Sequence, residues 1–159
     1  MGCVACVATA QPSSDDKARC GDASLDPDPR IESCTSVIQS GTLQPDQLPL
    51  AFFYRGVAHL ARGEPLAAQA DLTEGLRLDP ANAQAYSERG VVRVALNDFM
   101  GALADFGEAI RIDPSFAEAY RRRGLTFMAL GDHASAMAQF AQSIQLDPGV
   151  ADTYINRAA

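Results

Sequence analysis

Hydrophobic residues recur at intervals of three and four positions through the C-terminal two thirds of the chain. Residues 83–116 show the pattern twice in succession. The first run contains Ala85, Tyr86, Val92 and Leu96, and the second contains Ala102, Phe106, Ala109 and Ile110. This spacing places the apolar side chains of each run on one face of an α-helix. The segment therefore predicts two amphipathic helices in succession.

The same pattern returns every 34 residues. Six rows of like residues share this step: Phe52, Tyr86, Tyr120 and Tyr154; Arg55, Arg89, Arg123 and Arg157; Gly56, Gly90, Gly124 and Ala158; Ala68, Ala102 and Ala136; Leu72, Phe106 and Phe140; Pro80, Pro114 and Pro148. A fixed period of this length is typical of arrays in which each unit packs on its neighbours. We therefore expect helix pairs at residues 49–82, 83–116 and 117–150, followed by a partial repeat or capping helix at 151–159.

Short turn and stop signals divide each unit. The end of each first helix is predicted by a turn dipeptide: Arg62-Gly63, Asn97-Asp98 and Gly131-Asp132. Proline disfavours helical backbone in the residue before it. The end of each second helix is therefore predicted at Asp79-Pro80, Asp113-Pro114 and Asp147-Pro148.

Glycines in the middle of helices predict a close crossing. Gly90 and Gly124 lie inside expected helices, where glycine costs about 1 kcal/mol relative to alanine. That cost is explained if the two helices of a unit approach too closely for a Cβ atom. We expect the small residues Ala102 and Ala136 to lie opposite.

The arginine row predicts ion pairs within each unit. Arg55 and Arg89 have Asp71 and Asp105 at matching steps in the second helix, whereas the third unit has Gln139 there. We expect these pairs to bridge the two helices and, if exposed, to contribute at most about 1 kcal/mol each.

The third unit shows the full motif. It reads Tyr120-x2-Arg123-Gly124-x2-Phe127, then Ala136-x3-Phe140 and Pro148. This order resembles the tetratricopeptide repeat (TPR) signature, Trp-x2-Leu-Gly-x2-Tyr, Ala-x3-Phe and Pro, with arginine in place of the leucine. The resemblance covers residues 49–159. It implies an all-α fold: a right-handed α-solenoid of three TPR helix pairs with an N-terminal capping helix and a C-terminal partial repeat or capping helix.

Upstream of the repeats, residues 28–48 predict a capping helix and a loop. Asp28 is placed to cap a helix that starts at Pro29, and Gly41 is placed to end it. One face of this helix carries Ile31, Cys34, Val37 and Ile38. We expect a lone helix packed on the first repeat. Its sequence, RIESCTSVIQSG, also resembles the segment ahead of the repeats in exported bacterial TPR proteins.

Residues 1–27 predict a tail and a linker. The opening MGCVACVATAQP is apolar and contains Ala8-Thr9-Ala10, which is like a signal-peptidase site, but it has no basic start and a short apolar run. Residues 11–29 are polar and rich in proline. A degraded export signal and a plain disordered tail both remain open.

All four cysteines lie in the first 34 residues. In an exported protein, a disulfide between Cys20 and Cys34 would pin the linker to the capping helix and contribute about 3 kcal/mol. The alternative is that Cys34 is a small buried residue in a reducing compartment. The sequence favours an exported or periplasmic location over the cytoplasm. Cys3 and Cys6 have no second ligand pair, which argues against a metal site.

Composition and motifs exclude several classes of function. The net charge of −7 gives an acidic surface that repels nucleic acid. No apolar stretch approaches the roughly 20 residues of a membrane-spanning helix. The chain has no Gly-rich phosphate loop and no Gly-x-Ser-x-Gly motif, and His59 and His133 have no neighbours at ligand spacing. We therefore expect a protein that is not an enzyme and needs no cofactor or metal.

Stacked helix pairs form an extended concave surface. The resemblance implies that the first helices line this surface and that extended peptides or partner helices lie in it. The candidate peptide-binding groove consists of Phe53, Tyr54, Val57, Leu60, Ser87, Glu88, Val91, Glu118, Arg121, Arg122 and Leu125. The same register adds Leu50, Gln84, Val94 and Met128. We expect some of these residues to serve packing instead.

Some TPR proteins clamp the C-terminal carboxylate of chaperones with lysine, asparagine and arginine side chains. The matching positions here are Phe53, Val57, Glu88, Glu118 and Arg122. Only Arg122 fits the clamp, so we expect no binding to a chaperone tail. The groove grades from apolar to mixed charge, which suits an amphipathic segment with apolar anchors and at least one basic side chain.

The sequence therefore predicts a non-catalytic adaptor or scaffold that binds a protein or peptide. It does not name the partner. We expect a monomer or weak self-association. Two alternatives remain open: a recruitment or regulatory fragment of a larger multidomain enzyme, and an exported protein of envelope assembly.

Overall fold

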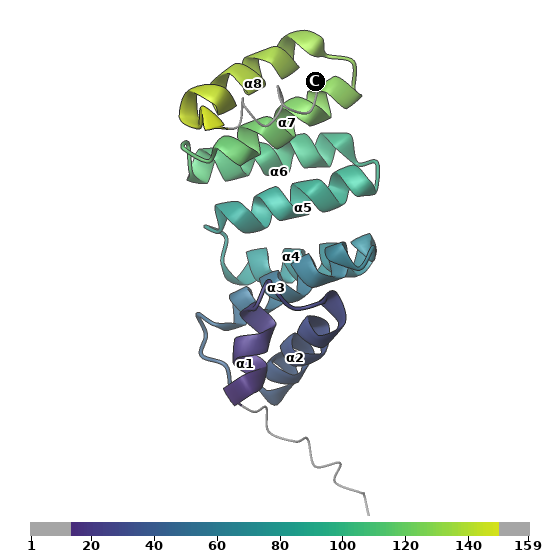
Figure 1. Ribbon diagram of the computed structural model, residues 1–159, viewed down its shortest axis with the longest axis vertical. Coiled ribbons are helices and arrows are strands. Elements are labelled where there is room, and N and C mark those ends of the chain that lie inside the picture. Colours follow the sequence, from purple (N-terminus) through teal and green to yellow (C-terminus); the bar gives the residue numbers. More distant parts are fainter. Residues whose placement is uncertain (1–13, 150–159) are drawn as a thin grey trace, which may run out of the picture.

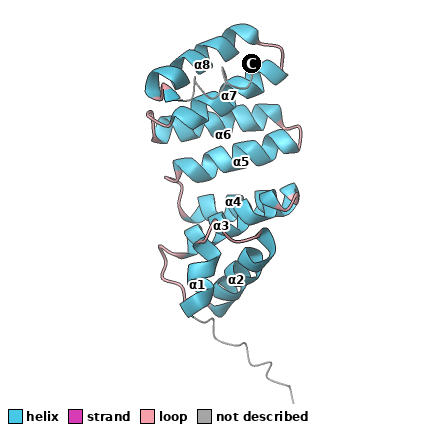
Figure 2. Cartoon of the chain, viewed as in Figure 1, coloured by secondary structure: helices cyan, strands magenta, loops and turns pink. Residues whose placement is uncertain are grey.

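The computed structural model describes residues 14–149, and every regular element in this range is a helix (Figure 2). The helices are α1 (Ser14–Gly21), α2 (Pro27–Ser40), α3 (Leu48–Ala61), α4 (Pro65–Leu78), α5 (Ala83–Ala95), α6 (Phe99–Ile112), α7 (Ala117–Ala129) and α8 (His133–Leu146). The three expected helix pairs are present, namely α3–α4, α5–α6 and α7–α8. The partial repeat expected at 151–159 and the signal-like segment at 1–13 lie outside the described residues.

Helices α3 to α8 lie across the long axis of the molecule, one pair above the next, with α1 and α2 at the N-terminal end (Figure 1). The second helix of each pair packs on the first helix of the following pair. Successive first helices also contact one another, from α3 to α5 and from α5 to α7, whereas the described second helices make no such contact. The first helices therefore form the inner, concave side of the stack, and the expected all-helical solenoid of helix pairs is confirmed.

The predicted turns and stop signals set the helix ends. Helices α4, α6 and α8 end one residue before the aspartate of each Asp-Pro dipeptide. The turn within each pair contains one residue with positive φ: Gly63 at 80°, Asn97 at 61° and Gly131 at 78°. The next helix is then capped by an aspartate in two pairs, because Asp98 accepts from the Gly101 amide and Asp132 from the Ser135 amide, each at 3.0 Å.

The glycines inside first helices mark close crossings, as expected, but the residue opposite differs from the prediction. A Cβ atom on Gly90 would lie 2.6 Å from Cε1 of Phe106, and one on Gly124 would lie 2.6 Å from Cε1 of Phe140. In the first pair a Cβ on Gly56 would lie 2.9 Å from Cγ of Leu72. Each glycine thus accommodates the large residue of the second helix, and not the neighbouring alanine.

The arginine row forms the predicted ion pairs. Arg55 donates from Nε and Nη2 to Asp71 at 2.8 and 2.7 Å, and Arg89 donates to Asp105 at 2.9 and 2.8 Å. In the third pair Arg123 donates to the amide oxygen of Gln139. The Asp105 side chain is only 4% exposed, so the magnitude given for an exposed pair does not apply to it. Removing the carboxylate of such a buried pair typically costs about 3–5 kcal/mol.

The surroundings of these guanidinium groups differ between the pairs. The hydrogen bond that Arg89 donates to Asp105 raises the pKa of Arg89, while burial lowers the pKa of Arg123, whose partner is the neutral amide of Gln139. Each arginine also lies over the aromatic ring three residues before it, at 5.4 Å for Arg89 over Tyr86 and 5.8 Å for Arg123 over Tyr120. This cation–π contact helps to hold the side chain against the second helix.

The N-terminal region differs from the prediction in two ways. Residues Ser14–Gly21 were expected to be linker but form α1, which packs on α2 and α3. The expected lone capping helix is therefore part of a helix pair. Helix α2 also starts earlier than expected, because Pro27 is its first residue and Asp26 precedes it. Asp28 lies in the first turn instead and accepts from Arg62 at 2.9 Å.

Cys20 of α1 and Cys34 of α2 form a disulfide in the structure. Both residues are buried, and together with Val37 and Ala51 they make a small core that is separate from the core of the repeats. Ile38, Leu43 and Tyr54 pack around it. The covalent bond thus holds α1 at the N-terminal end of the stack.

Candidate functional site

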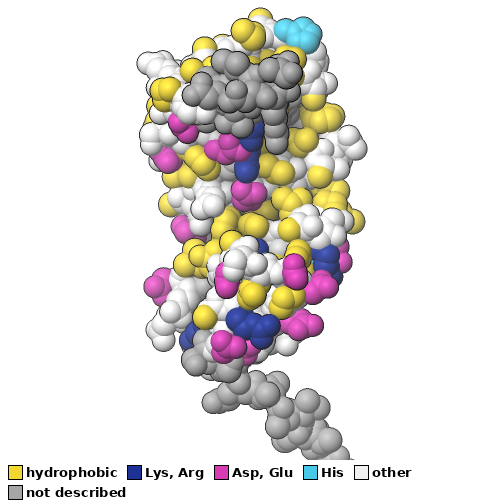
Figure 3. Space-filling model, in the orientation of Figure 1, with side chains coloured by type: hydrophobic (Ala, Val, Ile, Leu, Met, Phe, Trp, Pro, Cys, Tyr) yellow, Lys and Arg dark blue, Asp and Glu magenta, His cyan; other side chains and the backbone are white. Residues whose placement is uncertain are grey.

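The concave side contains an apolar recess of ≈ 330 Å³ between α5 and α7. Its lining consists of Val91, Val94, Phe106, Arg121, Arg122, Leu125, Thr126 and Ala129. Leu125 is 45% exposed, so an apolar side chain is available to a ligand. Figure 3 shows hydrophobic side chains across the middle of the visible face, at the level of α5, with basic and acidic side chains touching each other nearby.

The charged residues on this side form one cluster. Arg122 donates from Nη1 to Glu88 of the preceding pair at 2.9 Å and from Nε to Glu118 at 2.8 Å. Arg121 also pairs with Glu118. Burial alone would raise the pKa of Glu118, but the hydrogen bonds from the two arginines outweigh it and hold that pKa below its usual value. The rim of the recess therefore carries two carboxylates balanced by two guanidinium groups.

The structure brings several of the expected groove residues together. Val91, Arg121, Arg122 and Leu125 all line the recess, as does Val94 from the wider register. Glu88 and Glu118 adjoin it through their ion pairs with Arg122. The second and third pairs thus supply one continuous surface from α5 and α7.

Part of the sequence that forms this surface matches a known family model. The family model described as tetratricopeptide repeat matches residues 87–151, which include most of the second and third helix pairs. This part of the chain is therefore similar to tetratricopeptide repeats. A comparison with curated proteins found no match.

Solved structures share the fold over most of the described range. MamA aligns with a TM-score of 0.69 at 25% identity, covering 79% of this chain and 71% of MamA. The TPR domain of Arabidopsis OM64 aligns at 0.65 with 26% identity, covering 73% of this chain and all of that domain. The second TPR of Spaghetti (RPAP3), bound to the HSP90 peptide SRMEEVD, aligns at 0.61 with 27% identity, covering 64% and 94%. This likeness reaches beyond the part that the family model matches.

Some expected groove residues of these repeats are packing residues. The side chains of Phe53 and Ser87 are buried, at 8% and 0% exposed. Phe53 belongs to the core with Leu72 and Ala85, because its position on α3 faces α4 and α5 and not the open side. Tyr54, Val57 and Leu60 are partly buried against the same core. These residues of the first repeat thus serve packing, as was expected of some positions in the groove.

A second, smaller recess of ≈ 170 Å³ lies at the N-terminal end of the stack. It is lined by Lys17, Cys20, Val37, Leu43, Gln47, Leu50, Ala51 and Tyr54. Of the sequence-derived groove positions it includes Leu50 and Tyr54. Ala51 of α3 also lines it, and the remaining residues come from α1, α2 and the loop between α2 and α3, which the repeat pattern does not cover.

Three residues of the larger recess were not expected from the sequence. Phe106 comes from the second helix α6 and reaches the recess past Gly90, where a Cβ atom would block its ring. Thr126 is buried and donates its hydroxyl to the carbonyl of Arg122 at 3.0 Å. Ala129 is the last residue of α7. The row of glycines could have indicated that Phe106 reaches the concave side. No feature of the sequence indicated that Thr126 and Ala129 line the recess.

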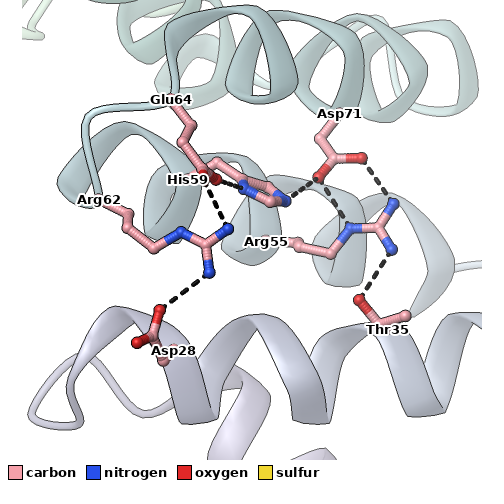
Figure 4. A network of polar contacts seen from close by, with 7 residues as sticks. All are labelled: Asp28, Thr35, Arg55, His59, Arg62, Glu64 and Asp71. Carbon is pink, nitrogen blue, oxygen red and sulfur yellow. Dashed lines mark hydrogen bonds and ion pairs between the residues drawn. The ribbon is translucent and has the colours of Figure 1, made fainter.

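A polar network joins the N-terminal pair to the first repeat (Figure 4). Its members are Asp28, Thr35, Arg55, His59, Arg62, Glu64 and Asp71. Arg62 connects the start of α2 to Glu64, with 2.9 Å to Asp28 and 2.6 Å to Glu64. The hydrogen bond from Arg62 is the main cause that lowers the pKa of Glu64. His59 Nδ1 lies 2.7 Å from the same carboxylate, so this histidine takes part in an interhelical contact.

Within the described range, no three His, Cys, Asp or Glu side chains gather as a metal site would require. None of the helices at 14–149 is long and apolar enough to span a bilayer.

Proposed function

We propose that the chain is a non-catalytic protein interaction module that binds a peptide or a helical segment on its concave side. The observation that carries this proposal is the apolar recess between α5 and α7. It lies where two first helices meet, and its walls come from neighbouring repeats, so a segment that runs along the stack would cross it. Buried apolar anchors in such recesses supply most of the affinity of protein interfaces.

The chemistry of the recess limits the partner. Val91, Val94 and Leu125 offer an apolar wall, which favours an aliphatic or aromatic anchor side chain. At the rim, Glu88 and Glu118 already bind Arg122. A basic side chain of the partner would have to compete with this arginine, and an acidic one with the two carboxylates. We therefore assign the main contribution to the apolar anchor and a smaller one to polar contacts at the rim.

The test is a selection from a displayed peptide library followed by measurement of Kd for the selected peptides. Leu125→Glu places a carboxylate in the recess at a position that is 45% exposed, so the fold should tolerate it. Leu66→Glu is the matched control, because Leu66 is 71% exposed at the start of α4 and lies outside the recess.

We expect Leu125→Glu to weaken binding by about tenfold or more, since an apolar anchor loses its pocket, while Leu66→Glu leaves Kd unchanged. Failure to select any peptide, or equal effects of the two substitutions, would refute the recess as the binding site.

We also propose that the chain works in an oxidising compartment, as an exported or periplasmic protein would. The Cys20–Cys34 disulfide supports this, because such bonds persist mainly outside the reducing cytosol. Mass spectrometry of protein isolated from its native cells with free thiols blocked at lysis would test it. Recovery of Cys20 and Cys34 as blocked thiols would contradict the proposal.

A further inference from the structure

Helices α1 and α2 repeat the arrangement of the later pairs. Helix α1 packs on α2, α2 packs on α3, and α1 contacts α3, which is the pattern of α3, α4 and α5. Helices α2 and α4 have the same length and both begin with proline. Thr35 of α2 accepts from Arg55 at 3.1 Å, and Thr73 of α4 accepts from Arg89 at 3.5 Å. The N-terminal pair therefore occupies the place of a further repeat.

This equivalence aligns the two cysteines with the close crossing of the other pairs. Arg19-Cys20 in α1 takes the place of Arg55-Gly56 in α3, and Ser33-Cys34 in α2 takes the place of Asp71-Leu72 in α4. In the first repeat, Gly56 packs on Leu72 and Arg55 pairs with Asp71. In the N-terminal pair, the disulfide stands where glycine meets leucine, and a serine stands where the carboxylate should be.

Besides the disulfide, α1 is held by a hydrogen bond from Ser36 of α2 to Asp16 at 3.3 Å and by the approach of Gly21 to the Tyr54 ring. It has eight residues, and Cys20 is its only buried side chain among those described. Isolated helices need about 12–15 residues to be even marginally stable in water. Residue 30, which aligns with the small Ala68, is a buried arginine whose Nε has no hydrogen-bond partner within the described part of the chain. The disulfide thus links α1 to α2 at the place where the first repeat has the contact between Gly56 and Leu72 and the ion pair between Arg55 and Asp71.

We propose that the Cys20–Cys34 disulfide is a redox-controlled latch that keeps α1 docked on the end of the stack. A dithiol reductant passes two electrons and two protons to the Sγ–Sγ bond, giving two cysteine thiols, and is itself oxidised to a disulfide. Helix α1 then loses its only buried anchor and leaves α2 and α3. Its departure removes Lys17 and Cys20 from the wall of the N-terminal recess and exposes Val37, Ala51 and Tyr54.

Limited trypsin digestion of the full chain tests the latch. Lys17 and Arg19 are the first two basic residues of the sequence, and both lie on α1. Cleavage after them requires α1 to unfold or detach. The experiment uses a Cys3→Ser, Cys6→Ser background, so that these thiols do not exchange with the disulfide. We expect reduction by dithiothreitol to speed cleavage at both sites by about tenfold or more, in line with the loop entropy that the bond removes.

Cys20→Ala with Cys34→Ala is the reference for the open state. It should be cleaved at the fast rate with and without reductant. Hydrogen exchange of amides in α5 and α6 serves as the fold control and should be the same in every sample. Equal cleavage rates at Lys17 and Arg19 in the oxidised and reduced chain, or a double-alanine variant as resistant as the oxidised chain, would overturn the proposal.

Discussion

At the scale of single residues, the contact between Gly90 and Phe106 sets the distance between the helices of a repeat. Phe106 is 1% exposed and lies against the backbone of α5 at Gly90. Glycine lowers the stability of α5 as an isolated helix, but it lets the ring lie against the helix backbone and reach the recess on the concave side. The same row of residues therefore stabilises the repeat and forms part of the binding surface.

The first prediction compares two glycines in the middle of helices. Gly90→Ala should lower the free energy of unfolding by about 1–3 kcal/mol, because the new Cβ would overlap the Phe106 ring. Gly107→Ala should raise it by about 0.5–1 kcal/mol, since the nearest atom to a Cβ there is Nη1 of Arg123 at 3.9 Å. Urea unfolding followed by circular dichroism measures both. Stabilisation by Gly90→Ala would contradict the close crossing.

At the scale of elements, the repeat pattern predicted α3 to α8 closely and missed α1. The six helices share a period, and rows of buried residues record it. Among the residues of α1 whose burial is described, only Cys20 is buried, so no hydrophobic spacing marks this helix in the sequence. Periodicity was thus enough to predict the fold of the repeats. The N-terminal pair depends on the Cys20–Cys34 disulfide, whose formation the sequence did not decide.

The sequence predicted which face of each helix carries the site, but not which residues of that face are exposed. Most residues that line the recess from α5 and α7 lie on the helix faces that the register assigned to the groove. Phe53 and Ser87 lie at the border of those faces, where a small rotation of the helix decides between core and groove. Periodicity gives the direction of a face, but the packing of neighbouring helices fixes that rotation.

The turn inside each repeat gives the second prediction. Gly131 has a φ of 78°, and a Cβ there would meet no atom within 4 Å. Gly131→Ala should therefore cost about 1 kcal/mol through backbone strain alone. Gly131→Asn should cost clearly less, because Asn97 adopts the same conformation at the equivalent position in the second repeat. Thermal unfolding of the two variants gives the comparison, and equal losses would argue against conformational strain as the cause.

At the scale of the whole molecule, the concave side differs from a carboxylate-binding surface. Of the positions that match a chaperone clamp, Phe53 is buried and Val57 is apolar. Glu88 and Glu118 are negative and bind Arg122, the single basic side chain in the set. A ligand carboxylate would have to compete with Glu88 and Glu118 for Arg122, and with Glu118 for the neighbouring Arg121.

The third prediction follows from this comparison. The peptide SRMEEVD, which is bound to the second TPR of Spaghetti (RPAP3), should show no measurable binding to this chain. Isothermal titration calorimetry with the RPAP3 domain as the positive control provides the measurement. A Kd within about tenfold of the control would show that the concave side accepts acidic tails despite Glu88 and Glu118.

Each helix of the stack meets only helices that are near it in the sequence. Every pair therefore offers to the next pair the same kind of surface that it receives from the one before. An in-frame duplication or deletion of one whole unit would leave matching surfaces at the new junction. Evolution can thus lengthen or shorten such a protein, and with it the reach of its ligand, without redesigning the interior.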